Sequence, residues 1–505
     1  MPNLAFRLVR SCASFALLQA LSSSLGLTMS ACSSEDGSSA SDPGGGSLDD
    51  APIEPRFQAL ATAFDEERVA LGATGAAIAI LERGEVTFAH GFGVKGPSSH
   101  EKARARTLFR IGSITKGFTA AAAMTLVDTG KLDLEAPITK VIPDLSINDP
   151  QISQVNLHLL MSHQAGLVDL SAYSGRSDDN GLSDYFTSPD FRDEAYFLAP
   201  PGTFYNYSNT NFDVTGLAVE RASGAPFRLY MREHVFQPLG MSRTFFLPED
   251  VVADGDYSTG MSSQEGAPGE IEPADVDVAW SRPDGGAFSS VLDLARWVKF
   301  LQVGTPEMMS DSSRNKLVTG HVYLGGAGHE TSYGYGLLVA TGLSTNGSDW
   351  RPTKVVMHDG RVPGFAGQII TLPETGFGIV ILVNAEVEFS TTVALALTSF
   401  GGLPDSVAQP KDILPQPNRF PQYAGTYFDP HQVGEITVSV EGTTVGISIP
   451  ALDSAAVTYD KTLIPIGNDS FFLNVAGSPT ELSFVPDNKG SYVWLRTREV
   501  VAHRE

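Results

Sequence analysis

The chain is 505 residues long, 42% of them hydrophobic and 18% charged, and its formal net charge at pH 7 is -24. The length exceeds that of one ordinary domain, and the composition is that of a globular protein with enough apolar residues for a sizeable core. The acidic excess argues against a nucleic-acid partner, because a phosphate backbone attracts clustered Lys and Arg.

The first 31 residues are predicted to form an export signal peptide. Arg7 and Arg10 give it a positive start, and an apolar stretch follows over residues 13–27. The stretch ends in Met29-Ser30-Ala31-Cys32, which resembles a bacterial lipobox in which Met replaces the usual Leu. We therefore expect lipidation of Cys32 and a membrane-anchored lipoprotein that faces the periplasm or the exterior. The alternative is a secreted protein whose signal is cut near Ala31.

A flexible linker is predicted over residues 32–54, because residues 33–50 are rich in Ser, Gly and Asp. The only two cysteines, Cys12 and Cys32, both lie in the signal region. The folded part of the chain therefore has no internal disulfide, thiol nucleophile or cysteine-ligated metal. Beyond the signal, no run of about 20 apolar residues predicts a transmembrane helix.

Residues 55–402 are predicted to form one domain of mixed α/β (α+β) class. Helical spacing over residues 55–72 precedes two β-like runs, 75–81 and 86–92, joined by a hairpin turn. The middle of the domain, residues 111–239, is mostly helical. A second β-rich block follows from residue 333, with runs at 355–358, 367–372 and 378–383 and a closing apolar helix at 391–400. This order predicts one antiparallel sheet flanked by helices, with an inserted helical lobe.

A second, smaller domain is predicted at the C-terminus. Residues 403–421 are rich in proline and indicate a linker. Residues 422–505 contain short alternating runs separated by Gly, Asn and Asp, at 436–440, 444–449, 470–473, 482–485 and 492–495. This pattern is typical of a small antiparallel β-sandwich or β-barrel.

The motif Ser-x-x-Lys occurs three times, at Ser99, Ser113 and Ser313, and its context must choose among them. Ser99 and Ser313 stand in polar segments that are expected to be exposed. Only Ser113, in Ser113-Ile114-Thr115-Lys116, is expected to open a long apolar helix. On a helix, Ser and Lys three residues apart share a face, so the amine of Lys116 can reach the hydroxyl.

The start of a helix also favours the chemistry of a nucleophile at Ser113. Free backbone N–H groups and the positive end of the helix dipole stabilise a developing oxyanion. The same field and burial lower the pKa of a lysine, which allows Lys116 to act as a neutral base. A simple helix N-cap explains Ser113 equally well on this feature alone.

Two further motifs follow in the chain. Tyr207-Ser208-Asn209 supplies a phenol that can relay a proton and an amide that can hold a substrate or the lysine. Tyr205 is a nearby rival, but it has no Asn two residues on. His358-Asp359-Gly360 ends an apolar run; its glycine permits a close backbone approach, and the N–H of Arg361 can complete an oxyanion hole. The alternative for Tyr207 and Asn209 is an aromatic residue in a loop followed by a helix cap. The alternative for His358 is a purely structural histidine.

In this order the three motifs resemble those of the serine β-lactamase-related and penicillin-binding-protein-like family. The resemblance is to the branch of class C β-lactamases, D-alanyl-D-alanine carboxypeptidases and esterases, and it covers roughly residues 55–401. The segments 159–167 and 285–294 resemble two further family segments, with Gln164 and Ala165 in place of the usual Thr-Ser pair. The C-terminal tail resembles a lipocalin-like β-barrel that is often appended to such enzymes.

The resemblance implies a role for each candidate residue. Ser113 would attack a carbonyl, and Lys116 with Tyr207 would take its proton and pass it to the leaving group. The N–H groups of Ser113 and Arg361 would hold the oxyanion, and Asn209 would position Lys116 and the substrate. His358 and Gly360 would line the substrate site. No cofactor and no metal are implied.

The third motif also bears on the substrate. β-Lactamases of this branch usually carry Lys-Thr-Gly there, and a neutral imidazole at His358 is a weaker anchor for a carboxylate. His-x-Gly is more typical of the family's esterases and D-peptidases. We therefore expect an esterase or a D-amino-acid peptidase or carboxypeptidase, whose substrate has an ester or amide carbonyl, with cell-wall peptides among the candidates.

Other functions remain as alternatives. A class C-like β-lactamase is the first, and a non-catalytic lipoprotein that binds cell-wall peptides is the second. The second would not need Ser113, Lys116 and Tyr207 together. The sequence has no Gly-x-Ser-x-Gly elbow and no His-Glu-x-x-His motif, which argues against an α/β-hydrolase and a metallohydrolase.

Overall fold

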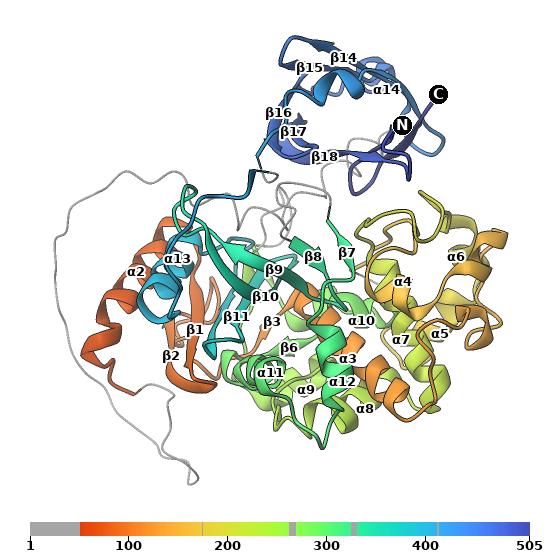
Figure 1. Cartoon of the computed structure of the whole chain (residues 1–505). Helices are drawn as coiled ribbons and strands as arrows, with labels where there is room; N and C mark the ends of the chain where they lie inside the picture. Colours follow the sequence, from red (N-terminus) through yellow and green to blue (C-terminus); the bar gives the residue numbers. More distant parts are fainter. Residues whose placement is uncertain (1–50, 174, 262–268, 325–330, 412–413) are drawn as a thin grey trace.

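The computed structural model describes residues 51–173, 175–261, 269–324, 331–411 and 414–505 (Figure 1). The predicted signal peptide and the lipidation site Cys32 lie outside these described residues. Among the described residues, none of the helices combines the length and the apolar character that crossing a membrane requires.

An eight-stranded antiparallel sheet forms the centre of the main domain, as the sequence predicted. Its strands come from both ends of the domain, so that β1 pairs with β12 in the register Ile78↔Ile381. In spatial order the strands are β2 (Glu85–Gly93), β1 (Gly75–Glu82), β12 (Phe377–Val383), β11 (Phe365–Leu372), β10 (Arg351–Val362), β9 (Leu338–Leu343), β8 (Thr331–Tyr333) and β7 (Val322–Tyr323).

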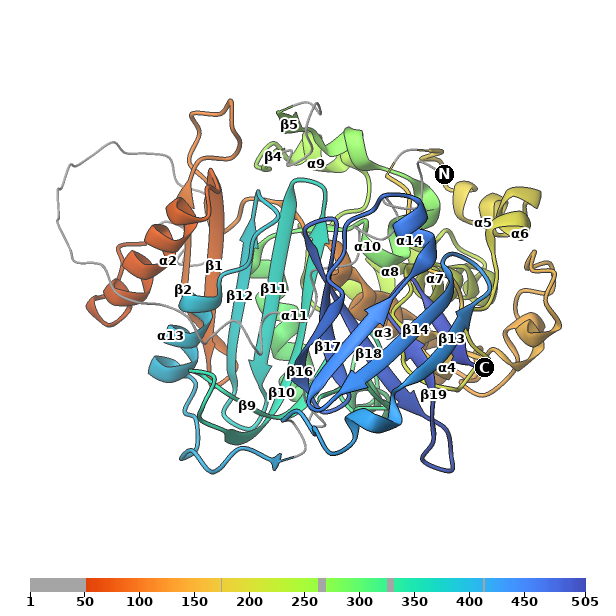
Figure 2. The same ribbon diagram turned by 90° about the horizontal axis from the view of Figure 1, so that it is seen from above.

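Helices cover both faces of this sheet. Helix α13 (Ser390–Phe400) packs against α2 (Gln58–Ala70) and β12, whereas α11 (Val291–Val303) packs on β1, β11 and β12 from the other side (Figures 1 and 2). Every residue of β11 and β12 is buried as a result. Their near-continuous apolar sequences are those expected of strands covered on both faces.

The remaining helices form the lobe that the sequence predicted between the two halves of the sheet. The central helix α3 packs against α7, α10 and α12 and is buried along almost its whole length. The helices of this region are α3 (Thr115–Asp128), α4 (Leu157–Met161), α5 (Gly181–Phe186), α6 (Pro189–Glu194), α7 (Asn209–Ser223), α8 (Phe227–Met231), α9 (Pro248–Asp254), α10 (Arg282–Gly285) and α12 (Asp311–Leu317).

Short elements connect these parts. Two-residue strands pair as β3 (Phe109–Arg110) with β6 (Phe288–Ser289), and as β4 (Gly260–Met261) with β5 (Glu270–Ile271). The 3₁₀ turns are η3 (Pro55–Phe57), η4 (Gly112–Ile114), η5 (Ile138–Lys140), η6 (Pro150–Gln154), η8 (Pro273–Val276), η9 (Ala279–Ser281) and η11 (Phe420–Gln422), and η7 (Arg232–Phe236) is a π-helical turn.

The C-terminal tail forms a closed eight-stranded barrel, which confirms the predicted small β-domain. The alternation of β14 places Ile436 and Val438 inside and polar neighbours outside. The sequence indicated five of the eight strands and missed β13, β16 and β20. The strands are β13 (Gly425–Asp429), β14 (Gly434–Glu441), β15 (Thr444–Ser448), β16 (Thr462–Gly467), β17 (Ser470–Val475), β18 (Ser478–Pro486), β19 (Tyr492–Arg496) and β20 (Val501–Arg504), with helix α14 (Pro450–Ser454).

The barrel rests on the main domain beside the helical lobe (Figures 1 and 2). Its Val501 joins a buried apolar cluster with Leu198 and Phe204 of the main domain. The ring of Phe204 also meets that of Trp494 edge to face, with centroids 5.6 Å apart. Both β19 and β20 therefore contribute to this contact, and the turn between them is held against the main domain.

Candidate active site

Ser113 lies in the 3₁₀ turn η4, which joins β3 to the central helix α3. We expected Ser113 to open the helix itself, but α3 begins at Thr115. The difference has a local cause: Gly112 has a φ of +52°, and the amide of Ile114 donates to the carbonyl of Ile111 at 3.3 Å. This tight turn precedes the first turn of α3 and leaves Lys116 on the helix, beside the Ser113 hydroxyl.

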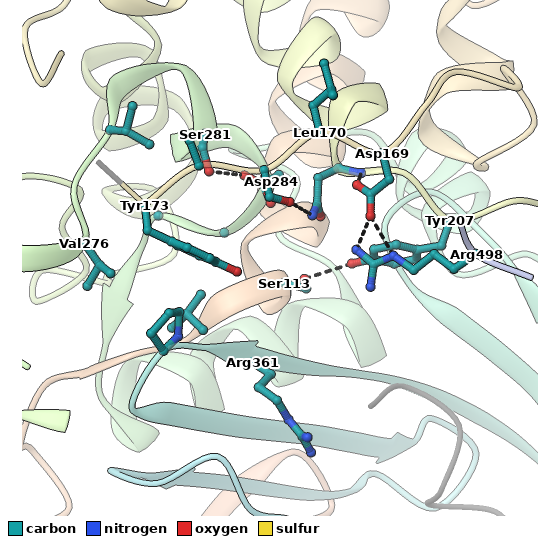
Figure 3. Close-up of a pocket in the computed structure, with 18 of the residues that line it drawn as sticks. Ser113, Asp169, Leu170, Tyr173, Tyr207, Val276, Ser281, Asp284, Arg361 and Arg498 are labelled. Carbon is teal, nitrogen blue, oxygen red and sulfur yellow. Dashed lines mark hydrogen bonds and ion pairs between the residues drawn. The ribbon is translucent and has the colours of Figure 1, made fainter. Parts of the chain in front are cut away.

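The hydroxyl of Ser113 is held by two of the predicted residues. The Nζ atom of Lys116 donates to Ser113 Oγ at 3.0 Å, and the phenol of Tyr207 donates to the same atom at 2.8 Å (Figure 3). The hydroxyl therefore contacts two groups, an amine and a phenol, with which it can exchange a proton. This is the geometry that activation of a serine nucleophile requires.

The other two Ser-x-x-Lys serines have different surroundings. Ser99 lies in a loop, where its Oγ accepts a hydrogen bond from the amide of Glu101 at 3.1 Å. Ser313 was expected to be exposed, and this expectation was wrong: it is buried in helix α12 and donates to Asp128 Oδ1 at 2.6 Å. That hydroxyl docks α12 onto the end of α3, which explains why a serine in a polar segment is buried.

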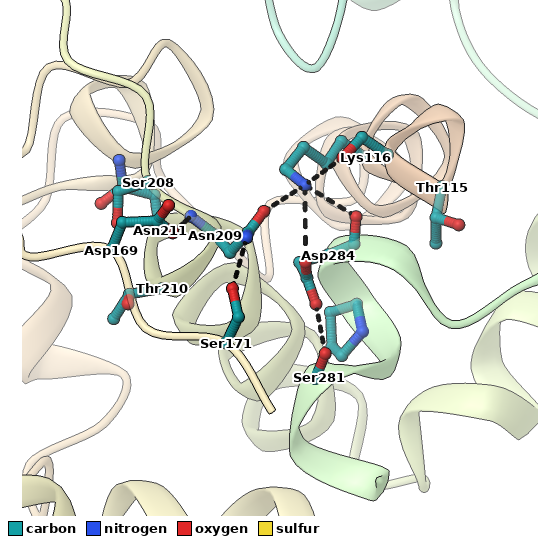
Figure 4. A network of polar contacts seen from close by, with 12 residues as sticks. Thr115, Lys116, Asp169, Ser171, Ser208, Asn209, Thr210, Asn211, Ser281 and Asp284 are labelled. Atoms are coloured by element: carbon teal, nitrogen blue, oxygen red, sulfur yellow. Dashed lines mark hydrogen bonds and ion pairs between the residues drawn. The ribbon is translucent and has the colours of Figure 1, made fainter. Parts of the chain in front are cut away.

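The amine of Lys116 is fully buried. Besides Ser113, it donates to Asn209 Oδ1 at 2.7 Å and to the backbone carbonyl of Asp284 at 2.8 Å (Figure 4). Burial lowers the pKa of Lys116, and the carboxyl groups of Asp284 and then Asp213 oppose this effect. A buried amine with a lowered pKa is suited to accept a proton.

Asn209 is the first residue of α7 and makes three hydrogen bonds, one of them with Lys116. Its amide N–H donates to Asp169 Oδ1 at 2.7 Å, and its side-chain Nδ2 donates to Ser171 Oγ at 2.8 Å. Its Oδ1 therefore has one defined direction, toward Lys116. Asn209 was expected to position both Lys116 and the substrate, and the structure shows its contact with Lys116.

The barrel domain also reaches this site, through Arg498 in the turn between β19 and β20. The Arg498 guanidinium forms an ion pair with Asp169 at 2.5 Å and lies 4.5 Å from the ring centroid of Tyr207 (Figure 3). Asn206 donates to the Arg498 carbonyl at 3.0 Å, which ties the turn to the Tyr207 loop.

The charge of Arg498 acts on the Tyr207 phenol. Burial raises the pKa of Tyr207, and the positive charge of Arg498 and the hydrogen bond to Ser113 act in the opposite direction. The barrel thus supplies a cation that favours the anionic form of the phenol.

Gly360 brings strand β10 against the turn that carries Ser113. A Cβ atom at Gly360 would lie 1.9 Å from the carbonyl oxygen of Ile111, and one at Gly112 would lie 2.6 Å from the amide nitrogen of Arg361. Only glycines allow the two backbones to meet this closely. The amide of Arg361 is thereby placed beside the Ser113 turn, as an oxyanion hole would need.

His358 lies within β10, because pairing with β11 continues beyond it through Gly360↔Gly367 to Val362. Its side chain is buried, with Nε2 2.9 Å from the hydroxyl of Tyr333. Burial lowers the pKa of His358 to about 3, so the imidazole is neutral at pH 7. The structure does not bring this side chain to the cavity described next, where the neighbouring Asp359 is found instead.

A cavity of about 1140 Å³ opens over Ser113 (Figure 3). Its wall includes Tyr207, Asn209 and the side of β10 at Arg361, whose guanidinium pairs with Glu388 at 3.0 Å. The barrel completes the wall with Gln432, Ser478, Pro479, Arg498 and Glu499. Both domains therefore shape the space in which a substrate would bind.

Sequence reasoning missed three residues of this site. Asp169 follows the family-like segment 159–167, and Asp284 precedes the Gly285-Gly286 pair, so the sequence could have indicated both as candidate site residues. Nothing in the sequence indicates Arg498, because only the docking of the barrel brings it to Tyr207. Within the described ranges, no group of three or more His, Cys, Asp and Glu side chains is placed to hold a metal ion.

Replacing Gly360 by Ala is expected to damage the site. The added methyl group meets a backbone oxygen, so the strand and the turn must separate, at a cost of roughly 1–3 kcal/mol. Denaturant unfolding should show this loss, and labelling by a fluorophosphonate, a serine-directed probe, should slow. Gly269→Ala, where a Cβ meets nothing within 4 Å, is the matched control. Equal stability and labelling of both variants would contradict the close approach.

Replacing Arg498 by Ala is expected to leave the buried carboxylate of Asp169 unpaired and to remove the cation over Tyr207. The free energy of unfolding should fall by about 3 kcal/mol, and fluorophosphonate labelling should slow by roughly tenfold. Arg419→Ala is the control, because it also removes a barrel ion pair, with Asp469, but away from the cavity lining. Labelling of Arg498→Ala at the rate of Arg419→Ala would show that Arg498 only supports the fold.

Comparisons with known proteins match most of the main domain to one family. A region matching the family model "Beta-lactamase" covers residues 57–398. The chain is 27% identical over 318 residues to Protein flp of Staphylococcus aureus (strain MW2), covering 62% of this chain and 60% of the relative. It is 26% identical over 324 residues to Unguisins hydrolase ungD' of Aspergillus campestris (strain IBT 28561), covering 61% and 58%. The chain thus spans about 60% of the length of these curated relatives.

Two solved structures share the fold over most of the chain. The octameric penicillin-binding protein homologue from Pyrococcus abyssi superposes with a TM-score of 0.58 at 26% identity, covering 88% of this chain and 99% of that one. SurE superposes with a TM-score of 0.66 at 21% identity, covering 89% and 99%. With the family match over more than half of its length, this chain belongs to the Beta-lactamase family of serine hydrolases, which resembles penicillin-binding proteins in fold.

Proposed function

We propose that this protein is an exported serine hydrolase that forms an acyl-enzyme on Ser113 and acts as an esterase or as a D-amino-acid peptidase or carboxypeptidase. One observation carries the proposal: Ser113 Oγ lies 3.0 Å from the amine of Lys116 and 2.8 Å from the phenol of Tyr207, at a cavity large enough for a small peptide or ester. A pure binding protein has no use for this set of contacts.

The first step is attack of Ser113 on a substrate carbonyl carbon. Lys116 in its amine form takes the proton of the hydroxyl as the Oγ–carbon bond forms. Tyr207, hydrogen-bonded to the same oxygen, then delivers its phenolic proton to the leaving group, an alcohol or an amine. It takes up in exchange the proton that Lys116 holds, so that both groups return to their starting forms. The cation of Arg498 stabilises negative charge on the phenol during this transfer.

Backbone groups stabilise the oxyanion, and water completes the cycle. The amides of Ser113 and Arg361 flank the point where Gly360 meets the Ser113 turn, and both can donate to the carbonyl oxygen. Lys116 takes a proton from the water molecule that attacks the acyl carbon and returns it to the oxygen of Ser113 as that oxygen leaves, which releases the acid and restores Ser113.

The state of His358 supports an ester or D-peptide substrate over a penicillin. A lysine at this position would offer its ammonium group to the carboxylate of the antibiotic. His358 is neutral, hydrogen-bonded to Tyr333 and turned away from the cavity, so it offers no positive charge there. The curated relative named a hydrolase, at 26% identity, supports hydrolysis without fixing the substrate.

The location of the protein is part of the proposal. The positive, apolar N-terminus and Met29-Ser30-Ala31-Cys32 support export and a lipid anchor on Cys32. Residues 32–54 would then tether the folded domains to the membrane, with the catalytic cavity exposed to extracytoplasmic substrates.

The nucleophile is tested by Ser113→Ala in the full mature protein. Hydrolysis of p-nitrophenyl acetate should fall by about 10³-fold or more, because the covalent step is lost. Ser99→Ala, which alters a loop serine of the same motif, should keep wild-type rates. Undiminished turnover in Ser113→Ala would overturn the proposal.

The substrate class is tested with three panels: short acyl esters, D-amino-acid peptides and nitrocefin. Hydrolysis of an ester or a D-peptide well above that of nitrocefin is the expected result. Fast nitrocefin hydrolysis would favour a class C-like β-lactamase instead. Binding of D-peptides with no turnover of any panel would favour a non-catalytic cell-wall-binding lipoprotein.

A further inference from the structure

Arg110 is a buried cation on the wall of the catalytic cavity. It belongs to strand β3, three residues before Ser113, and is only 3% exposed. Burial lowers the pKa of Arg110 to about 10, so its guanidinium is still positively charged at pH 7. A buried charge is costly unless nearby groups pair with it and accept its hydrogen bonds.

The guanidinium of Arg110 has few such partners. One of its terminal nitrogens donates to the carbonyl of Pro273 at 3.2 Å, and its Cζ lies 4.5 Å from the ring centroid of Phe288. Its Nε is buried without a hydrogen-bond partner. None of the carboxylates in the described part of the chain forms an ion pair with it. Because a guanidinium carries five N–H donors, most of those of Arg110 are left for a ligand.

The carboxylate that acts most strongly on Arg110 is that of Asp277, and it is bound to another arginine. Oδ1 of Asp277 accepts from Arg282 Nε at 3.1 Å, and Oδ2 accepts from a terminal nitrogen of Arg282 at 2.8 Å. The charge of Asp277 supports the charged form of Arg110, whereas the charge of Arg282 opposes it. Two cations therefore share one carboxylate, and one positive charge at this end of the cavity has no counter-ion of its own.

The other cations on the cavity wall are paired. Arg498 pairs with Asp169 at 2.5 Å, and Arg361 pairs with Glu388 at 3.0 Å. Among the described residues that line the cavity, Arg110 is thus the one cation without a carboxylate partner. Acidic side chains also line the wall, namely those of Asp359, Glu194, Glu386 and Glu499. Because like charges repel, these groups disfavour an anion elsewhere in the cavity.

Arg110 lies on the side of Ser113 that the acyl part of a substrate would occupy. In the mechanism above, Tyr207 protonates the leaving group, so the leaving group lies beside Tyr207. Figure 3 shows Val276 on the opposite side of Ser113. The turn η8 carries both Val276 and Pro273, the hydrogen-bond acceptor of Arg110. The acyl part, which extends away from the leaving group, therefore points toward Arg110.

We propose that Arg110 binds a carboxylate in the acyl part of the substrate. The preferred substrate would then be an ester or amide of a dicarboxylic acid, such as a half ester or a D-glutamyl or D-aspartyl peptide. This inference rests on the proposed serine hydrolase function and names the substrate class. A guanidinium binds a carboxylate through two parallel N–H···O bonds. The ligand thereby supplies the counter-ion that the fold does not provide, and its carboxylate takes no part in the reaction.

The test is calorimetric binding to full-length Ser113→Ala, which cannot form the acyl-enzyme. The probes are the monomethyl esters of glutaric, adipic and suberic acids and the matching ester amides, which have the same shape without the charge. For at least one chain length, the acid should bind roughly tenfold more tightly than its amide. Adding Arg110→Gln should abolish this preference. Arg419→Gln, which removes an arginine away from the cavity lining, should retain it.

Three calorimetric results would overturn this role. They are equal binding of acid and amide at every chain length, no binding of any probe, and a preference for the acid that survives Arg110→Gln.

Thermal unfolding distinguishes a ligand-binding arginine from a structural one. Arg110→Met removes a charge that has no ion-pair partner, whereas Arg282→Met leaves the carboxylate of Asp277 buried and unpaired. Arg282→Met should therefore lower Tm by several degrees more than Arg110→Met. An equal or larger fall in Arg110→Met, or its failure to fold, would mark Arg110 as structural and contradict the proposal.

The two proposals fail separately. Turnover of p-nitrophenyl acetate by Ser113→Ala would remove the serine mechanism, while the comparison of acid with amide would still report on the carboxylate site. An inactive Ser113→Ala whose preference for the acid is unchanged by Arg110→Gln would remove only the role of Arg110.

Discussion

The burial of a single amine, that of Lys116, is the constraint on which the rest of the site depends. A buried amine must have its hydrogen-bonding capacity satisfied, and here Ser113, Asn209 and Asp284 supply acceptors from three different segments. Those contacts fix the first turn of α3, the start of α7 and helix α10 relative to one another. The arrangement that lowers the pKa of Lys116, the proposed base, also places Ser113, the proposed nucleophile, beside it.

The second organising feature is the convergence of backbones and domains around Ser113. Gly112 and Gly360 let the Ser113 turn and strand β10 meet at distances that no side chain would permit. From the opposite side, the barrel contributes Arg498, which pairs with Asp169 and lies over the ring of Tyr207. The small domain is therefore a part of the cavity, and its apolar contact at Val501 and Phe204 keeps it in place.

Local patterns in the sequence predicted much of this. Apolar runs predicted the central strands, and the order of the motifs was enough to group Ser113, Lys116, Tyr207 and Asn209 in one site. Contacts between distant parts of the chain could not be predicted from the sequence. Arg498 is 291 positions from Tyr207 in the chain, and only the docking of the barrel brings the two side chains together. The sequence also could not show that His358 turns into the core, because strand β10 extends past it through pairing with β11.

The most direct measurement is to map the site of covalent labelling by mass spectrometry after fluorophosphonate treatment and tryptic digestion. Cleavage after Arg110 and Lys116 yields the peptide 111–116, in which Ser113 is the only serine, whereas Ser99 and Ser313 fall in the separate peptides 96–102 and 300–314. The account predicts one adduct, on residues 111–116. An adduct on either of the other peptides, or no adduct on native protein, would contradict it.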